Sequence, residues 1–145
     1  MTEVTDKIRI YLSHGDSGTR KVLEAIITKL GHEIHGISDT CEKTYSDCIE
    51  NPPDLILSGV EYKDGDGLEN LIAISRRKTM PSIVVTKKDS LDKVEKAMDD
   101  HVMAYMIEPV NSDELKPAIY VVLRRFEQLK QLEEENEVTS FIIRN

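Results

Sequence analysis

Short apolar runs alternate along the chain with longer amphipathic segments. The short runs are rich in β-branched residues, which is typical of β-strands, and the longer segments repeat apolar positions at helical spacing. Strands are predicted at residues 8–13, 33–37, 54–58, 82–86 and 103–107. Helices are predicted at residues 17–30, 40–50, 68–77 and 91–100, and from residue 112 onwards.

Five strand–helix units predict an α/β domain, with a parallel sheet covered by helices on both faces. The continuous apolar run at residues 54–58 is typical of a strand buried on both sides. In such sheets, ligands bind at the carboxyl ends of the strands. The segments to examine for function are therefore residues 13–16, 58–61, 86–88 and 107–110.

Two of these segments carry a specific resemblance. The stretch PDLILSG at residues 53–59, followed by DGLE at 66–69, and the stretch MAYMIEPV at 103–110 resemble the receiver domain of two-component response regulators. The resemblance covers residues 8–126, and residues 115–126 are similar to receivers attached to antiterminator regulators. It implies a flavodoxin-like (βα)5 doubly wound parallel sheet with strand order 2-1-3-4-5. We expect a receiver-like domain at residues 1–126, and a C-terminal helical extension and tail at 127–145.

The phosphorylation chemistry that the resemblance implies needs side chains that this chain lacks. The family's acidic, Mg²⁺-binding pair corresponds to His14 and Gly15, and its phosphoacceptor aspartate corresponds to Gly59. The family's lysine corresponds to Glu108, whose carboxylate would repel a phosphoryl group. Two positions match the family: the threonine that ends the fourth strand is Thr86, and the proline that follows the family's lysine is Pro109. The other positions differ. We therefore expect the phosphorylation pocket to be degenerate, with its Mg²⁺ site lost and no cofactor.

Other chemistry at the same pocket is weakly supported. Asp16 stands where the family often has a third acidic residue, and a cation held by Asp16, Glu61 and Glu108 is an alternative to a solvated acidic rim. His14 has no nucleophile paired with it in any motif, so we interpret it as structural. Residues 63–67 (KDGDG) predict a turn, because they lack the spaced ligands of a calcium loop. We expect no enzymatic activity.

The function predicted from these residues is signalling by a pseudo-receiver, through protein–protein contacts and without aspartyl phosphorylation. In the family, Thr86 and the strand aromatic corresponding to Tyr105 move together when the domain switches. Two alternatives stay open. One is a phosphorelay response regulator with an unconventional phosphorylation site, and the other is a module that binds a small ligand in the vacated pocket.

The C-terminal helix continues beyond the end of a bare receiver. Ile119, Val122, Phe126 and Leu129 follow a three- and four-residue spacing, which predicts a coiled-coil seam and a homodimer. The alternative is that this stripe packs on its own domain.

Composition narrows the classes of partner. The chain of 145 residues has 39% hydrophobic and 32% charged residues and a formal net charge of -8. An acidic chain without a clustered basic surface argues against binding to nucleic acids or anionic membranes. No apolar run approaches the ~20 residues that span a membrane, and the N-terminus does not resemble a signal peptide. We therefore expect a cytoplasmic protein, with Cys41 and Cys48 as reduced thiols.

Overall fold

The five predicted strands form one parallel sheet in the order β2-β1-β3-β6-β7. The structure is a computed structural model that describes the backbone of residues 7–98 and 104–144, with side chains as far as residue 134. The strands are β1 (Arg9–Ser13), β2 (Glu33–Ser38), β3 (Leu55–Ser58), β6 (Ser82–Thr86) and β7 (Ala104–Ile107). The predicted order 2-1-3-4-5 is confirmed, because the two extra strands β4 and β5 lie outside this sheet.

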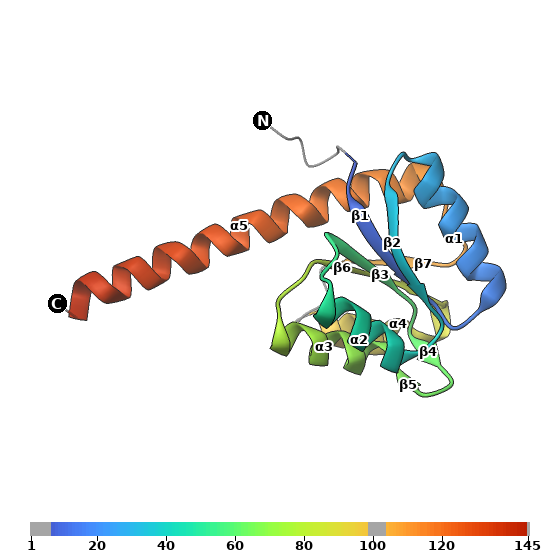
Figure 1. Cartoon of the computed structure of the whole chain (residues 1–145), viewed down its shortest axis with the longest axis horizontal. Coiled ribbons are helices and arrows are strands. Elements are labelled where there is room, and N and C mark those ends of the chain that lie inside the picture. Colours follow the sequence, from blue (N-terminus) through green and yellow to red (C-terminus); the bar gives the residue numbers. More distant parts are fainter. Residues whose placement is uncertain (1–6, 99–103, 145) are drawn as a thin grey trace.

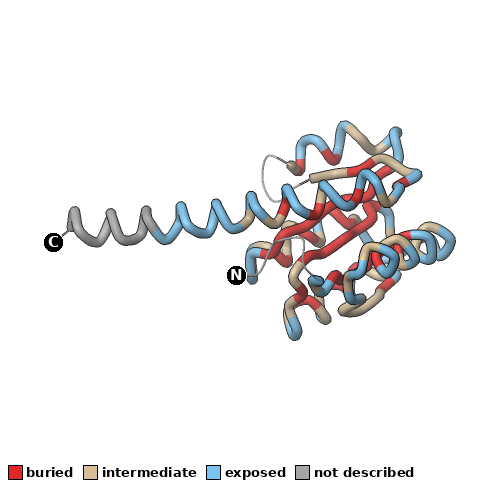
Figure 2. The backbone as a smooth tube through the Cα atoms, turned by 90° about the horizontal axis from the view of Figure 1, so that it is seen from above, coloured by how far each residue is buried: buried red, intermediate tan, exposed pale blue. Residues whose placement is uncertain are grey.

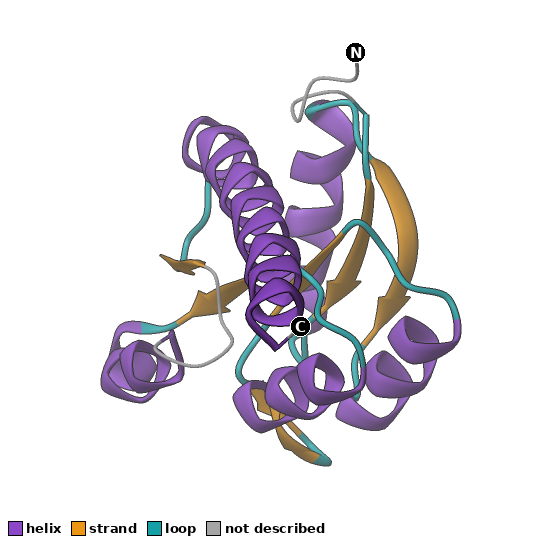
Figure 3. Ribbon diagram, turned by 90° about the vertical axis from the view of Figure 1, so that its left-hand side faces the viewer, coloured by secondary structure: helices purple, strands orange, loops and turns teal. Residues whose placement is uncertain are grey.

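Five α-helices cover the two faces of the sheet (Figure 3). They are α1 (Ser17–Lys29), α2 (Cys41–Glu50), α3 (Gly67–Arg77), α4 (Leu91–Met98) and α5 (Ser112–Arg144), with a short 3-10 helix η1 (Lys88–Ser90) before α4. Each boundary lies within two residues of its prediction where the structure describes the chain. Residues 99, 100 and 103, which the predictions for the fourth helix and fifth strand include, lie outside the described residues.

Strand alternation sorts the apolar side chains into two cores. Ile10 and Leu12 of β1 pack with Leu23 of α1 and Ile119 of α5 on one face. Tyr11 lies between them in sequence and points to the other face, where α2, α3 and α4 pack. Because successive side chains of a strand point to opposite faces, the continuous apolar strands serve both cores at once.

The loop after β3 contains a hairpin that the sequence did not predict. Glu61–Tyr62 (β4) and Gly65–Asp66 (β5) pair antiparallel around the turn that the sequence does predict. Gly67 then starts α3 so close to β3 that a Cβ on it would lie 2.2 Å from the carbonyl oxygen of Gly59. The hairpin is therefore held against the carboxyl end of β3, where the family's chemistry is located.

Helix α5 leaves the domain after its first turns (Figure 1). Ile119 and Val122 are each 1% exposed and belong to the core shared with α1. The alternative reading therefore holds for these two residues, and placing them in a dimer seam was wrong, because their side chains are already covered by the sheet. Within the described residues, no helix is both long and apolar enough to cross a membrane.

Candidate functional site

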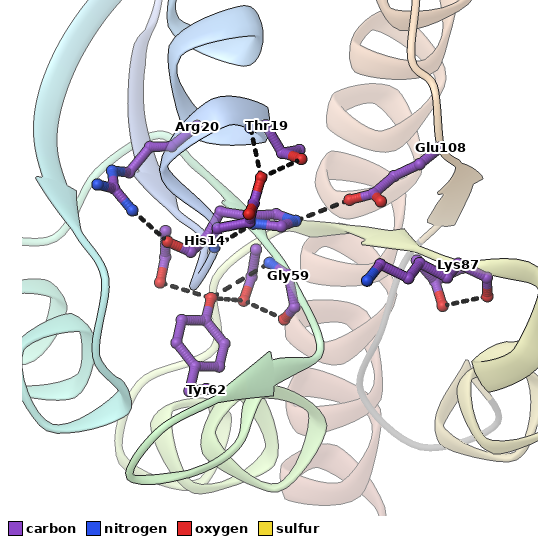
Figure 4. A network of polar contacts seen from close by, with 11 residues as sticks. His14, Thr19, Arg20, Gly59, Tyr62, Lys87 and Glu108 are labelled. Atoms are coloured by element: carbon purple, nitrogen blue, oxygen red, sulfur yellow. Dashed lines mark hydrogen bonds and ion pairs between the residues drawn. The ribbon is translucent and has the colours of Figure 1, made fainter.

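The predicted site residues meet at the carboxyl ends of four strands. His14 follows β1, Gly59 follows β3, Thr86 ends β6, and Glu108 follows β7. His14 and Glu108 are 94 residues apart in sequence, yet His14 Nε2 lies 2.8 Å from Glu108 Oε1 (Figure 4). The parallel topology brings these loops together, as the sequence analysis expected.

Hydrogen bonds orient the His14 imidazole. Its Nδ1 accepts a bond of 3.0 Å from the backbone N–H of Asp16. A nitrogen that accepts carries no hydrogen, so this bond assigns the hydrogen to Nε2, which then donates to the Glu108 carboxylate. The His14 main chain is held as well: its N–H donates to Ser38 O, and its carbonyl accepts from Arg20 Nη1 at 2.8 Å. The ring is buried and held in one orientation.

The imidazole fills the space beside Gly59. A Cβ built on Gly59 would lie 2.8 Å from His14 Cδ2 and 3.1 Å from His14 Nε2. Contacts that short do not occur for real Cβ atoms, so no side chain fits at position 59 while His14 keeps this position. His14 therefore occupies the volume through which an aspartate at position 59 would leave the backbone.

Tyr62 supports the same loop from below, and the sequence analysis missed it. Its hydroxyl lies 2.7 Å from Ser13 Oγ and 3.0 Å from Ser58 Oγ, and it accepts from the N–H of Gly59 at 3.2 Å. Burial raises the pKa of the Tyr62 hydroxyl, so it stays protonated at neutral pH. The sequence held no signal for this role, because a lone tyrosine in a polar loop fits no motif.

Gly15 and Asp16 border the strand-end cavity, but Gly15 has no room for a side chain and the Asp16 carboxylate is engaged by α1. A Cβ on Gly15 would lie 2.5 Å from the backbone oxygen of Glu61. The Asp16 carboxylate caps α1, where it accepts from the N–H of Thr19 at 2.8 Å and from its hydroxyl at 2.9 Å. These bonds lower the pKa of Asp16. Among the described residues, no group of three or more His, Cys, Asp or Glu side chains could hold a metal ion.

Of the predicted switch residues, Thr86 borders the same cavity as His14 and Glu108. Thr86 is buried, and its hydroxyl donates to the carbonyl of Lys87 at 3.0 Å. Tyr105 is half-buried and packs against the core under α3 and α4. Pro109 is exposed at the start of the loop to α5. The Thr86 hydroxyl is thus engaged by the backbone, and the switching role of Thr86 and Tyr105 stays a prediction.

A small cavity remains above the pair. It has a volume of about 220 Å³ and is bounded by His14, Glu108, Thr86, Lys87 and other residues of the strand ends. Figure 4 shows the Lys87 side chain extending toward the same space as Glu108. Lys87 lies in the strand-end segment 86–88 that the sequence pointed to, but no role was predicted for it. The cavity therefore carries both a carboxylate and an ammonium group at its edge.

Comparison with known families identifies residues 14–120 as a match to the response regulator receiver domain. The transcriptional regulatory protein PdtaR of Mycobacterium tuberculosis is 28% identical over 127 residues, which are 88% of this chain and 62% of PdtaR. The chain thus spans about three fifths of that relative's length.

Solved structures agree on the fold. A CheY-like receiver domain protein from Methanospirillum hungatei JF-1 superposes with a TM-score of 0.74 and 26% identity, over 85% of this chain and 98% of that one. A fusion that carries residues 181–211 of the trimeric coiled coil of yeast Spc42 superposes with a TM-score of 0.76 and 23% identity. The match to the fusion covers 95% of this chain and 97% of that one.

Proposed function

Because the chain belongs to the response regulator receiver family, we propose that it is a receiver-type signalling module that works without phosphorylation of an aspartate. One observation carries this proposal: the His14 ring occupies the space beside Gly59, where a Cβ would lie 2.8 Å from Cδ2. The family's nucleophile is missing, and its volume is filled by a hydrogen-bonded side chain.

The electrostatics of the pocket support the same proposal. Phosphoryl transfer is catalysed largely by positive groups that stabilise the charge of the transferred group. Here Glu108 places a carboxylate at the lysine position, and its bond to His14 keeps it in the pocket. A phosphoryl group bound there would meet like charge at short range. Lys87 is a positive group at the edge of the cavity, but the phosphoacceptor position holds Gly59, which has no carboxylate to accept a phosphoryl group.

The module then acts through contacts with other proteins. The resemblance implies that the family's threonine moves toward the phosphoryl group. In this chain the hydroxyl of the corresponding residue, Thr86, donates to a backbone carbonyl instead. We propose that the domain is held in one binding-competent state, with no enzymatic activity and no nucleic-acid ligand. Its partners include a second copy of the chain. The cytoplasmic location stays a prediction.

Intact-mass measurement tests the proposal. The full chain is incubated with Mg²⁺ and acetyl phosphate, and its mass is recorded at neutral pH, where an acyl phosphate survives. We expect no added phosphoryl group, while an unrelated active receiver treated in parallel gains one. A stoichiometric phosphoryl group on this chain would overturn the proposal, and mapping it would identify the unconventional site.

A variant with the family's side chains restored tests why we expect the wild-type chain not to be phosphorylated. The triple substitution His14→Asp, Gly59→Asp, Glu108→Lys removes the covering ring and restores the nucleophile and the lysine. Gly15 stays unchanged, because any Cβ there meets the backbone oxygen of Glu61 at 2.5 Å. We expect the triple variant to gain Mg²⁺-dependent phosphoryl incorporation. Gly59→Asp alone should not, because His14 still covers the site.

The cavity of about 220 Å³ supports ligand binding as a second candidate function. Its mixed edge of Lys87 and Glu108 suits a small zwitterion better than a simple anion. A ligand that binds only the folded state raises the melting temperature, so a thermal-shift screen of amino acids and related zwitterions tests this candidate. The shift should vanish in Glu108→Gln if the carboxylate contacts the ligand.

A further inference from the structure

The distal part of α5 extends beyond the domain (Figure 1). From residue 127 to residue 134 every side chain is exposed (Figure 2). The helix itself continues to Arg144. Most of the stability of a helix in a protein comes from packing an apolar face against another surface. Leu129 is 47% exposed and Leu132 is 57% exposed, so the single domain leaves such a stripe bare.

The bare leucines continue a repeat that begins inside the domain. Leu115 and Val122 are buried in the core, and Leu129 follows at the same seven-residue interval. Continuing at alternating three- and four-residue steps gives Leu129, Leu132, Asn136, Thr139 and Ile143. A seven-residue repeat keeps one line of side chains facing a supercoiled partner. The sheet covers the first members of this line, and a second helix is the surface that fits the rest.

We infer that residues 129–144 of α5 form a parallel, two-stranded coiled coil with α5 of a second copy of this chain. This inference rests on the proposed self-association and assigns its seam to Leu129 and Leu132 in place of Ile119 and Val122. It does not depend on whether the pocket can be phosphorylated. The paired segment is about 24 Å long at 1.5 Å per residue.

The partner is a second copy because the stripe is self-complementary. In a parallel pair each a-position leucine meets its own counterpart, and Asn136 falls on an a position of the same frame. A single asparagine at an a position favours two strands in register, at a cost in stability. The positions that flank the seam are compatible with a parallel pair, because Gln128 of one helix falls opposite Glu133 of the other. The acidic run at residues 133–135 therefore creates no like-charged pair at this flank.

A short seam of two leucines and one isoleucine, interrupted by an asparagine and a threonine, predicts a weak dimer. We expect a concentration-dependent monomer–dimer equilibrium for the full chain in sedimentation equilibrium. Leu129→Glu places two carboxylates in the seam and should weaken the dimer at least ~100-fold, since two buried leucines are lost at roughly tenfold each. Gln131→Glu adds the same charge almost opposite on the helix and should leave the dimer unchanged.

Leu132→Cys tests the direction of the two helices. In a parallel pair in register, the two introduced thiols face each other and should cross-link under mild oxidation, while Gln131→Cys should not. The native thiols Cys41 and Cys48 are buried in the domain and do not compete.

Each other outcome has a distinct meaning. A wild-type chain that stays monomeric at all concentrations overturns the inference. A dimer that survives Leu129→Glu keeps the proposed self-association but refutes this seam. A dimer that depends on Leu129 without cross-linking at position 132 refutes the parallel arrangement, and a trimer refutes two strands. None of these results alters the phosphoryl measurement, so the two proposals fail separately.

Discussion

His14 and Gly59 depend on each other: the imidazole lies where a side chain of residue 59 would begin, 2.8 Å from the ideal Cβ position. The pair is adjacent only in space, because the two residues follow neighbouring strands β1 and β3. Glu108 completes the arrangement from β7 by accepting from the ring. The loops that carry these three residues thus meet in one hydrogen-bonded contact at the carboxyl ends of the strands.

The steric relation between His14 and Gly59 predicts a strong coupling in stability. Gly59→Ala forces its methyl group into the His14 ring and should lower the free energy of unfolding by about 1–3 kcal/mol, as overpacked sites do. In a His14→Ala background the same substitution should cost much less, because the space is vacated. Urea unfolding of the four proteins measures the coupling. Gly65→Ala is the control, because a Cβ there meets its nearest atom, Cys41 Sγ, at an ordinary 3.6 Å, and its cost should be the same in both backgrounds. Equal costs in both backgrounds would show that His14 does not fill the site.

The hydroxyl of Tyr62 should contribute modestly to stability. Tyr62→Phe removes bonds to Ser13, Ser58 and the N–H of Gly59. Each of these partners keeps another bond, to Thr44 Oγ1, Gly59 O and Ser13 O respectively. We therefore expect a loss of about 1 kcal/mol, and no full penalty for unpaired buried groups.

Chemical denaturation measures the Tyr62→Phe loss, and Tyr120→Phe serves as the control because Tyr120 is 42% exposed on α5. The control should change stability by less than about 0.5 kcal/mol. A Tyr62→Phe protein as stable as wild type would mean that the aromatic ring alone supports the hairpin.

Asp64 should make stability depend on pH at the acid end. Its carboxylate accepts from the N–H groups of Cys41 and Glu42 at the start of α2, and these bonds lower the pKa of Asp64 below its ordinary value of 3.8. A carboxyl with a depressed folded pKa stabilises the protein above the unfolded pKa, and this contribution is lost as pH falls through the folded pKa.

The pH dependence is measured by urea unfolding of wild type and Asp64→Asn. Asp64→Asn should therefore be less stable than wild type at pH 7, and the difference should shrink once the pH drops below about 4. A difference that stays constant down to pH 2 would contradict the carboxylate's role as a cap.

Both thiols should be slow to react in the native protein. Burial raises the pKa of Cys41 to about 11 and that of Cys48 to about 12, and nearby aspartates add to both shifts. Since the thiolate is the reactive form, alkylation by iodoacetamide at pH 8 should be far slower than for a free cysteine. Reaction should become fast in urea. Rapid labelling of either residue in the folded protein would show that α2 opens readily.

Periodicity predicted the elements of the fold. The alternation of short apolar runs with helical repeats predicted all five sheet strands and a parallel α/β sheet, because local patterning leaves few arrangements. The strand order and the correspondence of His14, Gly59, Thr86 and Glu108 to the family's site came from the resemblance, and the strand-end argument pointed only to the segments that contain these residues. The β4–β5 hairpin escaped prediction, because two-residue strands have no periodicity to detect.

The amino-acid sequence by itself thus determined the architecture and the absence of the family's charged groups. Both depend only on the local pattern and on which residue stands at each position. Only the tertiary structure decided what replaced them. That His14 covers Gly59, and that Tyr62 holds the loop beneath it, depends on contacts between distant segments. The same holds for α5, where Ile119 and Leu129 are equally apolar in sequence. The sheet covers Ile119 but does not extend as far as Leu129. Ile119 is therefore a core residue and Leu129 is a surface residue.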